Sequence, residues 1–193
     1  SKDKTVSLLC TRNPNLRKSD SSFQILIDTA PIHKVQTYKF LGLILDDQIS
    51  WKPHFQYIHD RCKQRINIMR ALTGYKWGAS KANLLLIYKM AIRSILDYGC
   101  QAFNQATDTR KQVLQTIQSV ALRIAYSAPI STCKNAILAE SGELPLDLRR
   151  KLLTAIYAVQ TRVTPNHPVS QIFFPNPENS RNWKKRKNAP KQH

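Results

Sequence analysis

The sequence lacks the features that mark several common protein classes. It has no run of about 18 apolar residues, so we expect no membrane-spanning helix. Its five glycines stand singly at expected turns and element ends, whereas a loop that cradles phosphates needs a glycine cluster. Neither H-E-x-x-H nor G-x-S-x-G occurs, so the common signatures of a zinc peptidase and of an α/β-hydrolase are absent.

Cysteine is sparse and scattered. The four cysteines occur without any C-x-x-C pair, at Cys10, Cys62, Cys100 and Cys133. This spacing indicates neither a zinc ribbon nor a compact disulfide framework, and we interpret all four as free thiols. None of the five histidines has a cysteine at zinc-binding spacing. We therefore predict no metal site and assign no catalytic residue in this chain.

Acidic side chains are also scarce. Twelve Asp and Glu residues stand against 30 Lys and Arg residues, which gives a formal net charge of +18. Basic surfaces gain affinity for polyanions by releasing counterions from phosphate groups. We therefore expect nucleic acid as the first partner, ahead of an acidic membrane surface.

Both ends of the sequence bear on its location. The first residues, SKDKTV, have neither an initiating methionine nor the apolar core of a secretory signal. Residues 181–187, RNWKKRK, suit a nuclear import signal, a nonspecific phosphate-binding patch or a merely solubilising basic linker. We expect an intracellular, nuclear protein fragment with no membrane partner.

The first part of the chain has short β-like runs, at residues 5–10, 23–27 and 38–45, and the segment from FQILI to IHKV resembles a hairpin. After Ser50 the apolar spacing changes to steps of three or four residues, which is typical of an amphipathic helix. Five helices are expected: one from Ser50 to Gly74, one from a Ser80 cap to Gly99, one starting at Asp108 with Val113 inside, one over about residues 131–141, and one over residues 145–163.

The sequence thus predicts an α+β fold. A short N-terminal antiparallel β portion, residues 1–48, precedes a mainly antiparallel bundle of five helices, residues 49–163. Residues 164–193 combine several prolines with lysines and arginines and are predicted to be a basic, flexible tail or linker. Among the aromatic residues, Trp51 and Trp77 stand beside helix starts, and we expect both to be exposed.

An acidic doublet, Asp46-Asp47, follows the apolar run of residues 38–45 and allows two interpretations. Polymerases place carboxylates at strand ends to hold two Mg²⁺ ions. A further carboxylate would be needed, and the only upstream candidates are Asp3, Asp20 and Asp28. The alternative is a turn that leads into the first helix, where Asp favours the helix start. We favour the turn.

A basic stripe runs along the first helix beside its apolar face. Lys52, His59, Lys63 and Arg70 share one side at about 100° per residue. Arg61 and Arg65 lie one turn apart on the opposite shoulder. The stripe is either an ordinary solvated helix edge or a row of phosphate contacts, and the net charge favours phosphate. Lys52, Lys63 and Arg70 are our candidates for contacts to a nucleic-acid backbone.

Several motifs occur in a fixed order: Lys4-Thr5, F-L-G at 40–42, L-D at 45–46 followed by W-x-x-H at 51–54, L-D-Y-G at 96–99, Gln118, E-S-G-E-L-P-L at 140–146, and Arg149-Arg150. The ordered set resembles the end of the reverse transcriptase of non-LTR retrotransposons of the LINE type, jockey-like, over about residues 4–163. The usual Y-L-G box differs here, because Lys39-Phe40 precedes Leu41.

The resemblance implies that residues 1–48 finish a polymerase palm, with Phe40, Leu41 and Gly42 in a primer-grip-like strand, and that residues 49–163 form the thumb and connection. The catalytic F/Y-A-D-D box of that family lies upstream, and this sequence has no such box. The resemblance therefore implies a chain that holds a duplex of RNA template and DNA primer but is inactive alone. The Mg²⁺ cofactor belongs to the missing part, and the upstream palm and fingers of the same polyprotein are implied partners.

Two rival hypotheses remain open at this point. The chain is alternatively a stand-alone basic helical protein that binds nucleic acid and has no polymerase parent. A third hypothesis is an intact enzyme that uses Asp46-Asp47 for catalysis.

Overall fold

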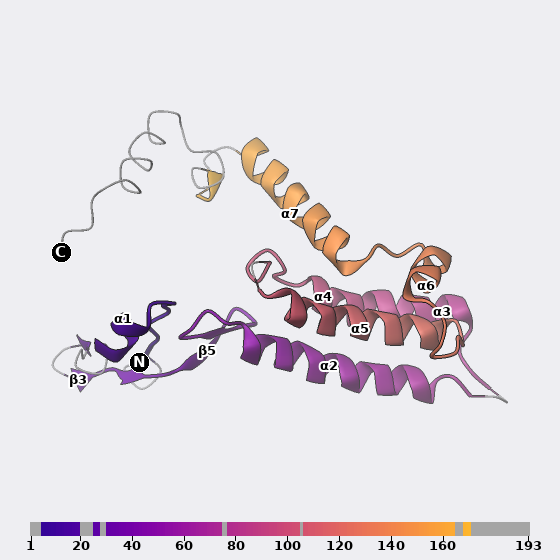
Figure 1. The fold of residues 1–193 in the computed structure, drawn as a ribbon, viewed down its shortest axis with the longest axis horizontal. Coiled ribbons are helices and arrows are strands. Elements are labelled where there is room, and N and C mark those ends of the chain that lie inside the picture. The colour runs from indigo at the N-terminus through magenta and orange to yellow at the C-terminus, as the bar shows by residue number, and fades with distance from the viewer. Residues whose placement is uncertain are drawn as a thin grey trace.

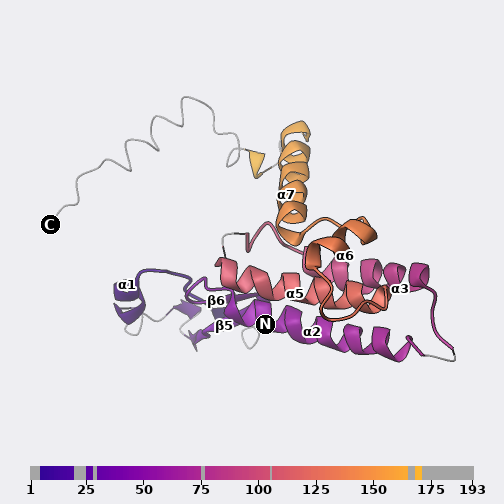
Figure 2. The same cartoon turned by 45° about the vertical axis from the view of Figure 1, so that its right-hand side comes forward.

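The computed structural model describes residues 5–19, 25–27, 30–74, 77–104, 106–164 and 168–170. Three long helical segments lie side by side and enclose the hydrophobic core, and small β pairs stand at one end of them (Figure 1). A last helix leaves the bundle on the side away from the first long helix (Figure 2). The described part of the chain is therefore mixed helix and strand, with the strands confined to its N-terminal portion.

The described strands of the N-terminal β portion form three separate pairs, and two of these pairs are very short. β1 (Val6–Ser7) pairs in parallel with β4 (His33–Lys34), and β2 (Leu26–Ile27) pairs antiparallel with β3 (Ala30–Pro31). The β2–β3 pairing agrees with the predicted hairpin, whereas the β1–β4 pairing differs from the predicted antiparallel arrangement. A parallel pair needs a long connection, and the segment between β1 and β4, which includes α1 (Pro14–Ser19), supplies it.

The run predicted as a single strand over residues 38–45 is a hairpin instead. β5 (Thr37–Phe40) pairs antiparallel with β6 (Leu43–Asp46), in the register Phe40 opposite Leu43. Leu41 and Gly42 form the two-residue turn, with φ values of 45° and 84°. Two positive φ values are what a tight hairpin loop requires, and glycine supplies the second without strain.

The first long helix, α2 (Lys52–Ala71), confirms the predicted helix after Ser50. Its buried side chains recur every three or four residues: His54, Phe55, Ile58, Cys62, Ile66 and Met69. The prediction that Trp51 is exposed is wrong, because only 6% of its surface is accessible. Its ring packs against Phe103, with centroids 6.1 Å apart. Trp77 is 70% exposed, as predicted.

The second long segment is continuous but not uniform. α3 (Lys81–Ile87) is followed by a π-helical turn, η3 (Tyr88–Arg93), and by α4 (Ser94–Asp97). The predicted cap is confirmed, since the Asn83 N–H donates to Ser80 Oγ at 3.3 Å. The π-helical turn was not predicted; it keeps Tyr88 and Ile92 buried in the core.

The third long helix, α5 (Asp108–Ala125), packs against α2 and against the preceding helical segment. Val113 was predicted to lie inside, but it is 42% exposed at the edge of the contact between α5 and α2. The short helix α6 (Lys134–Ser141) also packs on α5 and ends at Gly142, whose φ is 64°. This left-handed residue confirms the predicted glycine stop.

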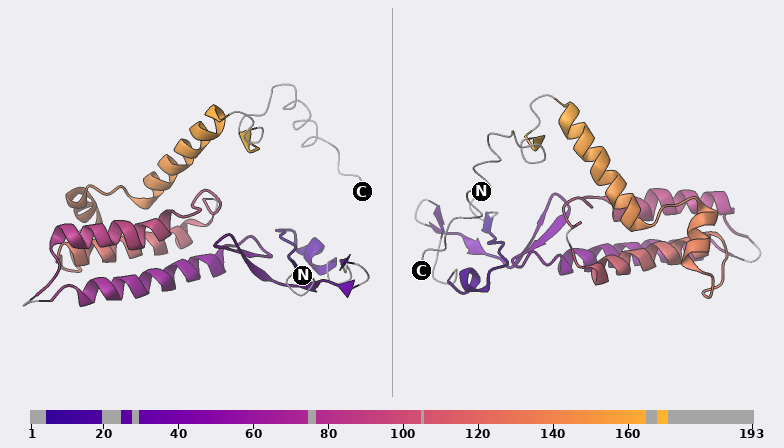
Figure 3. Two further views of the ribbon diagram at one scale, coloured as in Figure 1. Left: turned by 180° about the vertical axis from the view of Figure 1, so that it is seen from behind. Right: turned by 45° about the horizontal axis from the view of Figure 1, so that its top comes forward.

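The last helix, α7 (Leu146–Val163), starts against the bundle and then diverges from it (Figure 3). Leu146 and Arg150 are buried near its start. On another side of the helix, apolar side chains are exposed at helical spacing: Leu148, Leu152, Ile156, Val159 and Val163. The helix forms as predicted, but it extends the bundle rather than lying antiparallel within it.

Within the described residues, no helix is long and apolar enough to cross a membrane. The predicted flexible tail lies almost wholly outside the described residues, and so does the basic segment 181–187. Lys4, at the start of the motif series, is also outside them.

Candidate nucleic-acid interface

Asp46 organises the turn that leads into α2. Only 5% of the residue is exposed, and its two carboxylate oxygens accept the N–H groups of Ser50 and Trp51, each at 2.8 Å. Burial raises the pKa of this carboxyl group, but these hydrogen bonds and the nearby Arg110 outweigh burial, so the pKa is lowered from 3.8. Both oxygens are thus engaged with the backbone, as the turn interpretation of the doublet requires.

The loop that Asp46 holds has an unusual backbone. Ile49 and Trp51 both have positive φ values, 53° and 61°, which are strained for residues with a Cβ atom. The Arg110 guanidinium on α5 donates to the Ser50 carbonyl and so ties the loop to the bundle. The strained conformation turns the Trp51 ring inward and fixes the start of α2.

His54 connects the start of α2 to the hairpin. It is buried, and its Nδ1 accepts the Ile44 N–H at 3.4 Å. Burial lowers the pKa of His54, which favours the neutral ring that this acceptor role requires. The W-x-x-H motif therefore joins β6 to α2 through packing and one hydrogen bond.

The F-L-G motif lies at the tip of the β5–β6 hairpin. Phe40 is 57% exposed and Leu41 is 74% exposed. The Tyr98 hydroxyl donates to the Leu41 carbonyl at 2.6 Å, and a Cβ atom on Gly42 would lie 3.0 Å from the Tyr98 ring. Tyr98 of the L-D-Y-G motif thus holds the turn, and the apolar side chains of the hairpin tip remain exposed.

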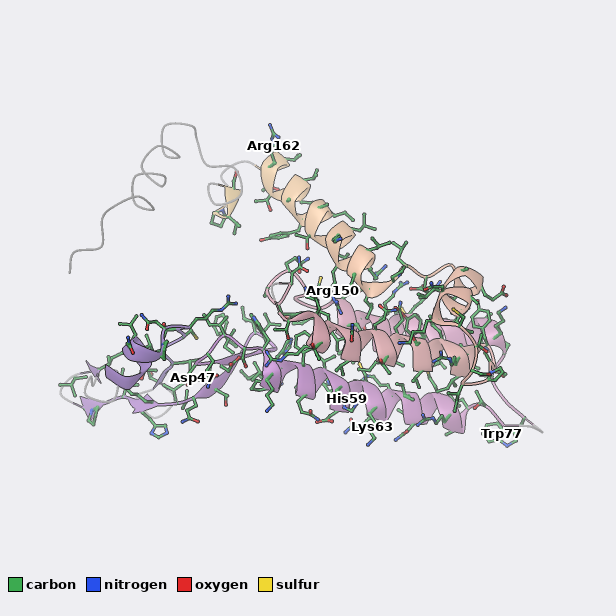
Figure 4. All side chains as sticks on the ribbon, in the orientation of Figure 1. Asp47, His59, Lys63, Trp77, Arg150 and Arg162 are labelled. Atoms are coloured by element: carbon green, nitrogen blue, oxygen red, sulfur yellow. The ribbon has the colours of Figure 1, made fainter. Side chains whose placement is uncertain are left out.

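The predicted basic stripe lies on one side of α2, and Figure 4 shows two of its members, His59 and Lys63, near each other on that helix. Lys63 and Arg70 border a groove of about 380 Å³ between α2 and α5, and Ile66, Val113, Ile117 and Val120 contribute its apolar lining. Lys52 is exposed at the start of α2 but does not line this groove. The structure therefore brings two of the three candidates together.

The groove continues past Arg70 along α5. Its second part is lined by Arg70, Arg123 and Ile130, among others. Arg123 Nη2 donates to the Thr132 carbonyl at 2.9 Å, which holds the loop after α5 beside the groove. Sequence reasoning did not assign Arg123 to an interface, because only the packing of α5 on α2 places it in line with Arg70.

A second basic row lies on the other side of α2. Tyr57, Arg61 and Arg65 are spaced four residues apart, and Lys39 of β5 reaches the same row from the hairpin. Arg61 and Lys63 are two residues apart, which is about 200° around a helix, so the two rows face opposite sides. Lys39 was not among the predicted site residues, because its neighbour in space is 18 positions away in the sequence.

The later motifs meet at the junction between the bundle and α7. Arg149 donates to both carboxylate oxygens of Asp97, with its Nε at 2.8 Å from each oxygen and its Nη2 at 2.6 Å from Oδ2. Arg93 Nη1 similarly approaches both oxygens of the buried Glu143, at 2.8 and 3.1 Å. These pairs join the L-D-Y-G, E-S-G-E-L-P-L and Arg-Arg motifs and fix where α7 leaves the bundle.

Gln118 completes this junction from inside the core. It is fully buried, and its amide nitrogen donates to the Tyr88 hydroxyl and to the Leu144 carbonyl, both at 3.1 Å. Its amide oxygen accepts from Gln115 at 2.8 Å. Burial raises the pKa of the Tyr88 hydroxyl well above its ordinary value, so it remains protonated. We conclude that Gln118 has a structural role.

Several curated proteins are similar to this chain. The probable RNA-directed DNA polymerase from transposon X-element of Drosophila melanogaster is 27% identical over 100 residues, 52% of this chain. The RNA-directed DNA polymerase from mobile element jockey of Drosophila funebris is 27% identical over 105 residues, 54% of this chain. The Pol polyprotein from the type-1 retrotransposable element R1 of Bradysia coprophila is 23% identical over 123 residues, 60% of this chain.

The matched stretches make up only 11% to 12% of these relatives' own length. No protein-family model matches the chain. No solved structure matches it either. Over about half its length, the chain is similar to a short stretch of the RNA-directed DNA polymerases of non-LTR retrotransposons.

Proposed function

We propose that this chain is part of the thumb and connection region of a retrotransposon reverse transcriptase, and that it holds the duplex of RNA template and DNA primer. The proposal rests on one structural observation: an exposed apolar hairpin tip is joined to a long helix that has rows of basic side chains. The relatives of this chain are named RNA-directed DNA polymerases. In this proposal Phe40, Leu41 and Gly42 lie near the primer end.

The rigidity of the hairpin supports this role. Its tip is fixed by the Tyr98 hydroxyl, and its base is joined to α2 through His54 and Asp46. A loop that positions the end of a primer must keep its place relative to the helices that grip the duplex. These contacts join the hairpin to the helical bundle at both its tip and its base.

The basic side chains of α2 supply the second part of the role. Lys52, Lys63 and Arg70 are exposed on one side of a helix of 20 residues. Such a helix is about 30 Å long, which matches several successive phosphates of a duplex. Contacts to the backbone hold a duplex without reading its sequence, as a polymerase that copies many sequences requires.

The chemistry belongs to another part of the parent protein in this proposal. The single acidic doublet that resembled a metal site contains Asp46, whose oxygens are both occupied by backbone N–H groups. We propose that Mg²⁺ and its carboxylate ligands lie in an upstream palm, that the palm and fingers contact this chain, and that the parent acts in the nucleus. Primer extension with Mg²⁺ should give no product with this chain alone.

The direct test is binding of an RNA–DNA heteroduplex with a recessed primer end, followed by fluorescence anisotropy over a series of KCl concentrations. Neutralising Lys52, Lys63 and Arg70 together, each to Gln, should lower the slope of log affinity against log salt by about three, because each phosphate contact contributes about 0.9. A control that changes Lys134 and Lys151 to Gln removes exposed charge from α6 and α7, which lie beyond α5 from α2 (Figure 1).

The control variant measures how much the salt slope falls per removed charge because of net charge alone. If the salt slope falls by the same amount per removed charge in the α2 variant, the assignment of Lys52, Lys63 and Arg70 is contradicted. Equal affinity for the recessed duplex and for a blunt duplex, with no effect of changes at the hairpin tip, would favour the rival hypothesis of a stand-alone helical nucleic-acid-binding protein.

A further inference from the structure

We propose that Lys39, Tyr57 and Arg61 form a binding site for one phosphate group of the nucleic-acid backbone, next to the hairpin tip. The site rests on the proposed function and specifies one contact within it. It uses β5 and the side of α2 opposite to Lys63 and Arg70.

The three side chains converge on one atom. Lys39 Nζ lies 3.1 Å from the Tyr57 hydroxyl oxygen, and Arg61 Nη1 lies 2.8 Å from the same oxygen. Lys39 Nζ is also 4.6 Å from the centre of the Tyr57 ring. The two cationic nitrogens are therefore within about 6 Å of each other. Side chains from the hairpin and from α2 thus form a compact positive cluster.

Within the described part of the chain, no carboxylate balances the positive charge of the cluster. Among the residues that the structure describes, no Asp or Glu forms an ion pair with Lys39, Arg61 or the next member of the row, Arg65. Like charges at this separation repel each other, and an anion placed between them removes the repulsion. A phosphate oxygen is the anion that a chain of net charge +18 meets on nucleic acid.

The Tyr57 hydroxyl provides the third contact. A phenol oxygen can accept two hydrogen bonds and donate one. Lys39 and Arg61 occupy the two acceptor positions, and within the described part of the chain no acceptor faces the hydroxyl hydrogen. The hydrogen bonds from Lys39 and Arg61 lower the pKa of Tyr57, which makes its hydroxyl a stronger donor. Two cations and one O–H donor suit a singly charged phosphodiester.

Because Phe40 lies near the primer end in the proposed function, the position of the site relative to Phe40 indicates which phosphate it binds. Lys39 precedes Phe40, and successive side chains of a strand point to opposite faces. The hairpin therefore presents Phe40 on one face and directs Lys39 to α2 on the other. Arg65 lies one turn farther along α2 from Arg61. The site would thus hold a phosphate a few nucleotides from the primer end, with Arg65 beside the next part of the backbone.

The test uses the recessed RNA–DNA heteroduplex and three variants: Lys39→Gln, Arg61→Gln and the double variant. If both cations bind the same phosphate, each single variant keeps one cation on that phosphate and should change the salt slope little, whereas the double variant should lower the slope by about one. Tyr57→Phe, which removes the hydroxyl without changing charge, should weaken binding severalfold. Lys134→Gln on α6 is the matched charge control and should leave the slope nearly unchanged.

A second arm locates the phosphate. Duplexes that carry one neutral methylphosphonate at successive primer positions should include a single position that weakens binding to the wild-type chain but not to the double variant. Additive slope losses of about two in the double variant would overturn the single-phosphate site. Unchanged slopes in all variants, with duplex binding intact, would also overturn it while leaving the proposed function in place.

Two further outcomes separate the hypotheses. Absence of any duplex binding by the wild-type chain would instead contradict the proposed function itself. Inorganic phosphate, titrated alone and followed by NMR of the Tyr57 ring, should saturate more weakly than the duplex. Tighter saturation by inorganic phosphate would mean a free-anion site and would contradict our inference.

Discussion

Changing Asp46 to Asn should destabilise the protein by about 3 kcal/mol. The carboxylate accepts two backbone N–H groups at 2.8 Å in a site that is 5% exposed. An asparagine keeps one acceptor oxygen, but its NH₂ group faces the second N–H. Leaving one buried N–H without an acceptor costs about 1–3 kcal/mol, and replacing a charged acceptor by a neutral one costs about 1 kcal/mol more.

The matched control for this prediction is Asp47→Asn. Asp47 is the neighbouring residue and undergoes the same chemical change, but among the described residues only its backbone makes hydrogen bonds, to Thr11 and to Gln36. We expect a change within about 0.5 kcal/mol for this surface substitution. The assay is thermal unfolding followed by circular dichroism, in which a loss of 3 kcal/mol lowers Tm by about 6–12 °C for a chain of this size.

The pH dependence gives a second check on Asp46. Its folded pKa is lowered from the ordinary 3.8, so the unfolded chain binds the proton more tightly. The stabilisation by the carboxylate is therefore full above pH 3.8 and is lost as pH falls through the lower folded pKa. The difference in stability between wild type and Asp46→Asn should shrink in the same range. Equal stability of the Asp46→Asn and Asp47→Asn variants at neutral pH would refute the assignment of Asp46 to the turn.

Two other predictions concern the contacts that hold the hairpin and α7. In chemical unfolding, Gly99→Ala should lower the free energy of unfolding more than Gly142→Ala. Both glycines have positive φ, but of the two only Gly99 has a neighbour that an added Cβ atom would meet, Leu43 Cδ2 at 2.7 Å. Equal losses of stability in the two variants would contradict this steric reason. A double-mutant cycle of Asp97→Asn and Arg149→Gln should give a coupling energy of about 1–2 kcal/mol, since the ion pair is bidentate and mostly buried. A coupling energy near zero would mean that this ion pair does not hold α7.

Local patterns in the sequence predicted the helices well. The buried positions of α2 follow from the spacing of Phe55, Ile58 and Cys62, which does not depend on the rest of the fold. The Ser80 cap and the Gly142 stop are likewise local, because each acts within one helical turn. These features needed no knowledge of tertiary contacts.

The misses have tertiary causes. The β5–β6 hairpin was read as one strand because Leu41 is apolar, and Gly42 alone did not reveal a turn that Tyr98, 57 positions from Leu41, stabilises. Trp51 was expected at the surface because no local pattern indicates that Asp46 and Phe103 hold it inward.

The candidate site was predicted only in part for the same reason. Lys63 and Arg70 could be grouped by helix phase, since both lie on α2. Arg123 and Lys39 come from other elements, and only the packing of α5 and of the hairpin places them beside the basic rows. The partners Asp97 and Arg149 are 52 positions apart, so no sequence spacing could pair them.

The most direct test of the central claim is a photocrosslink from the hairpin tip to the primer. The crosslinker p-benzoylphenylalanine in place of Phe40, which is 57% exposed, should label the DNA strand of a recessed RNA–DNA heteroduplex within a few nucleotides of its 3′ end. The same crosslinker in place of Leu152, exposed on α7, should give little labelling there. Labelling from Phe40 that is absent, or spread evenly along the duplex as from Leu152, would contradict the proposal that this hairpin lies at the primer end.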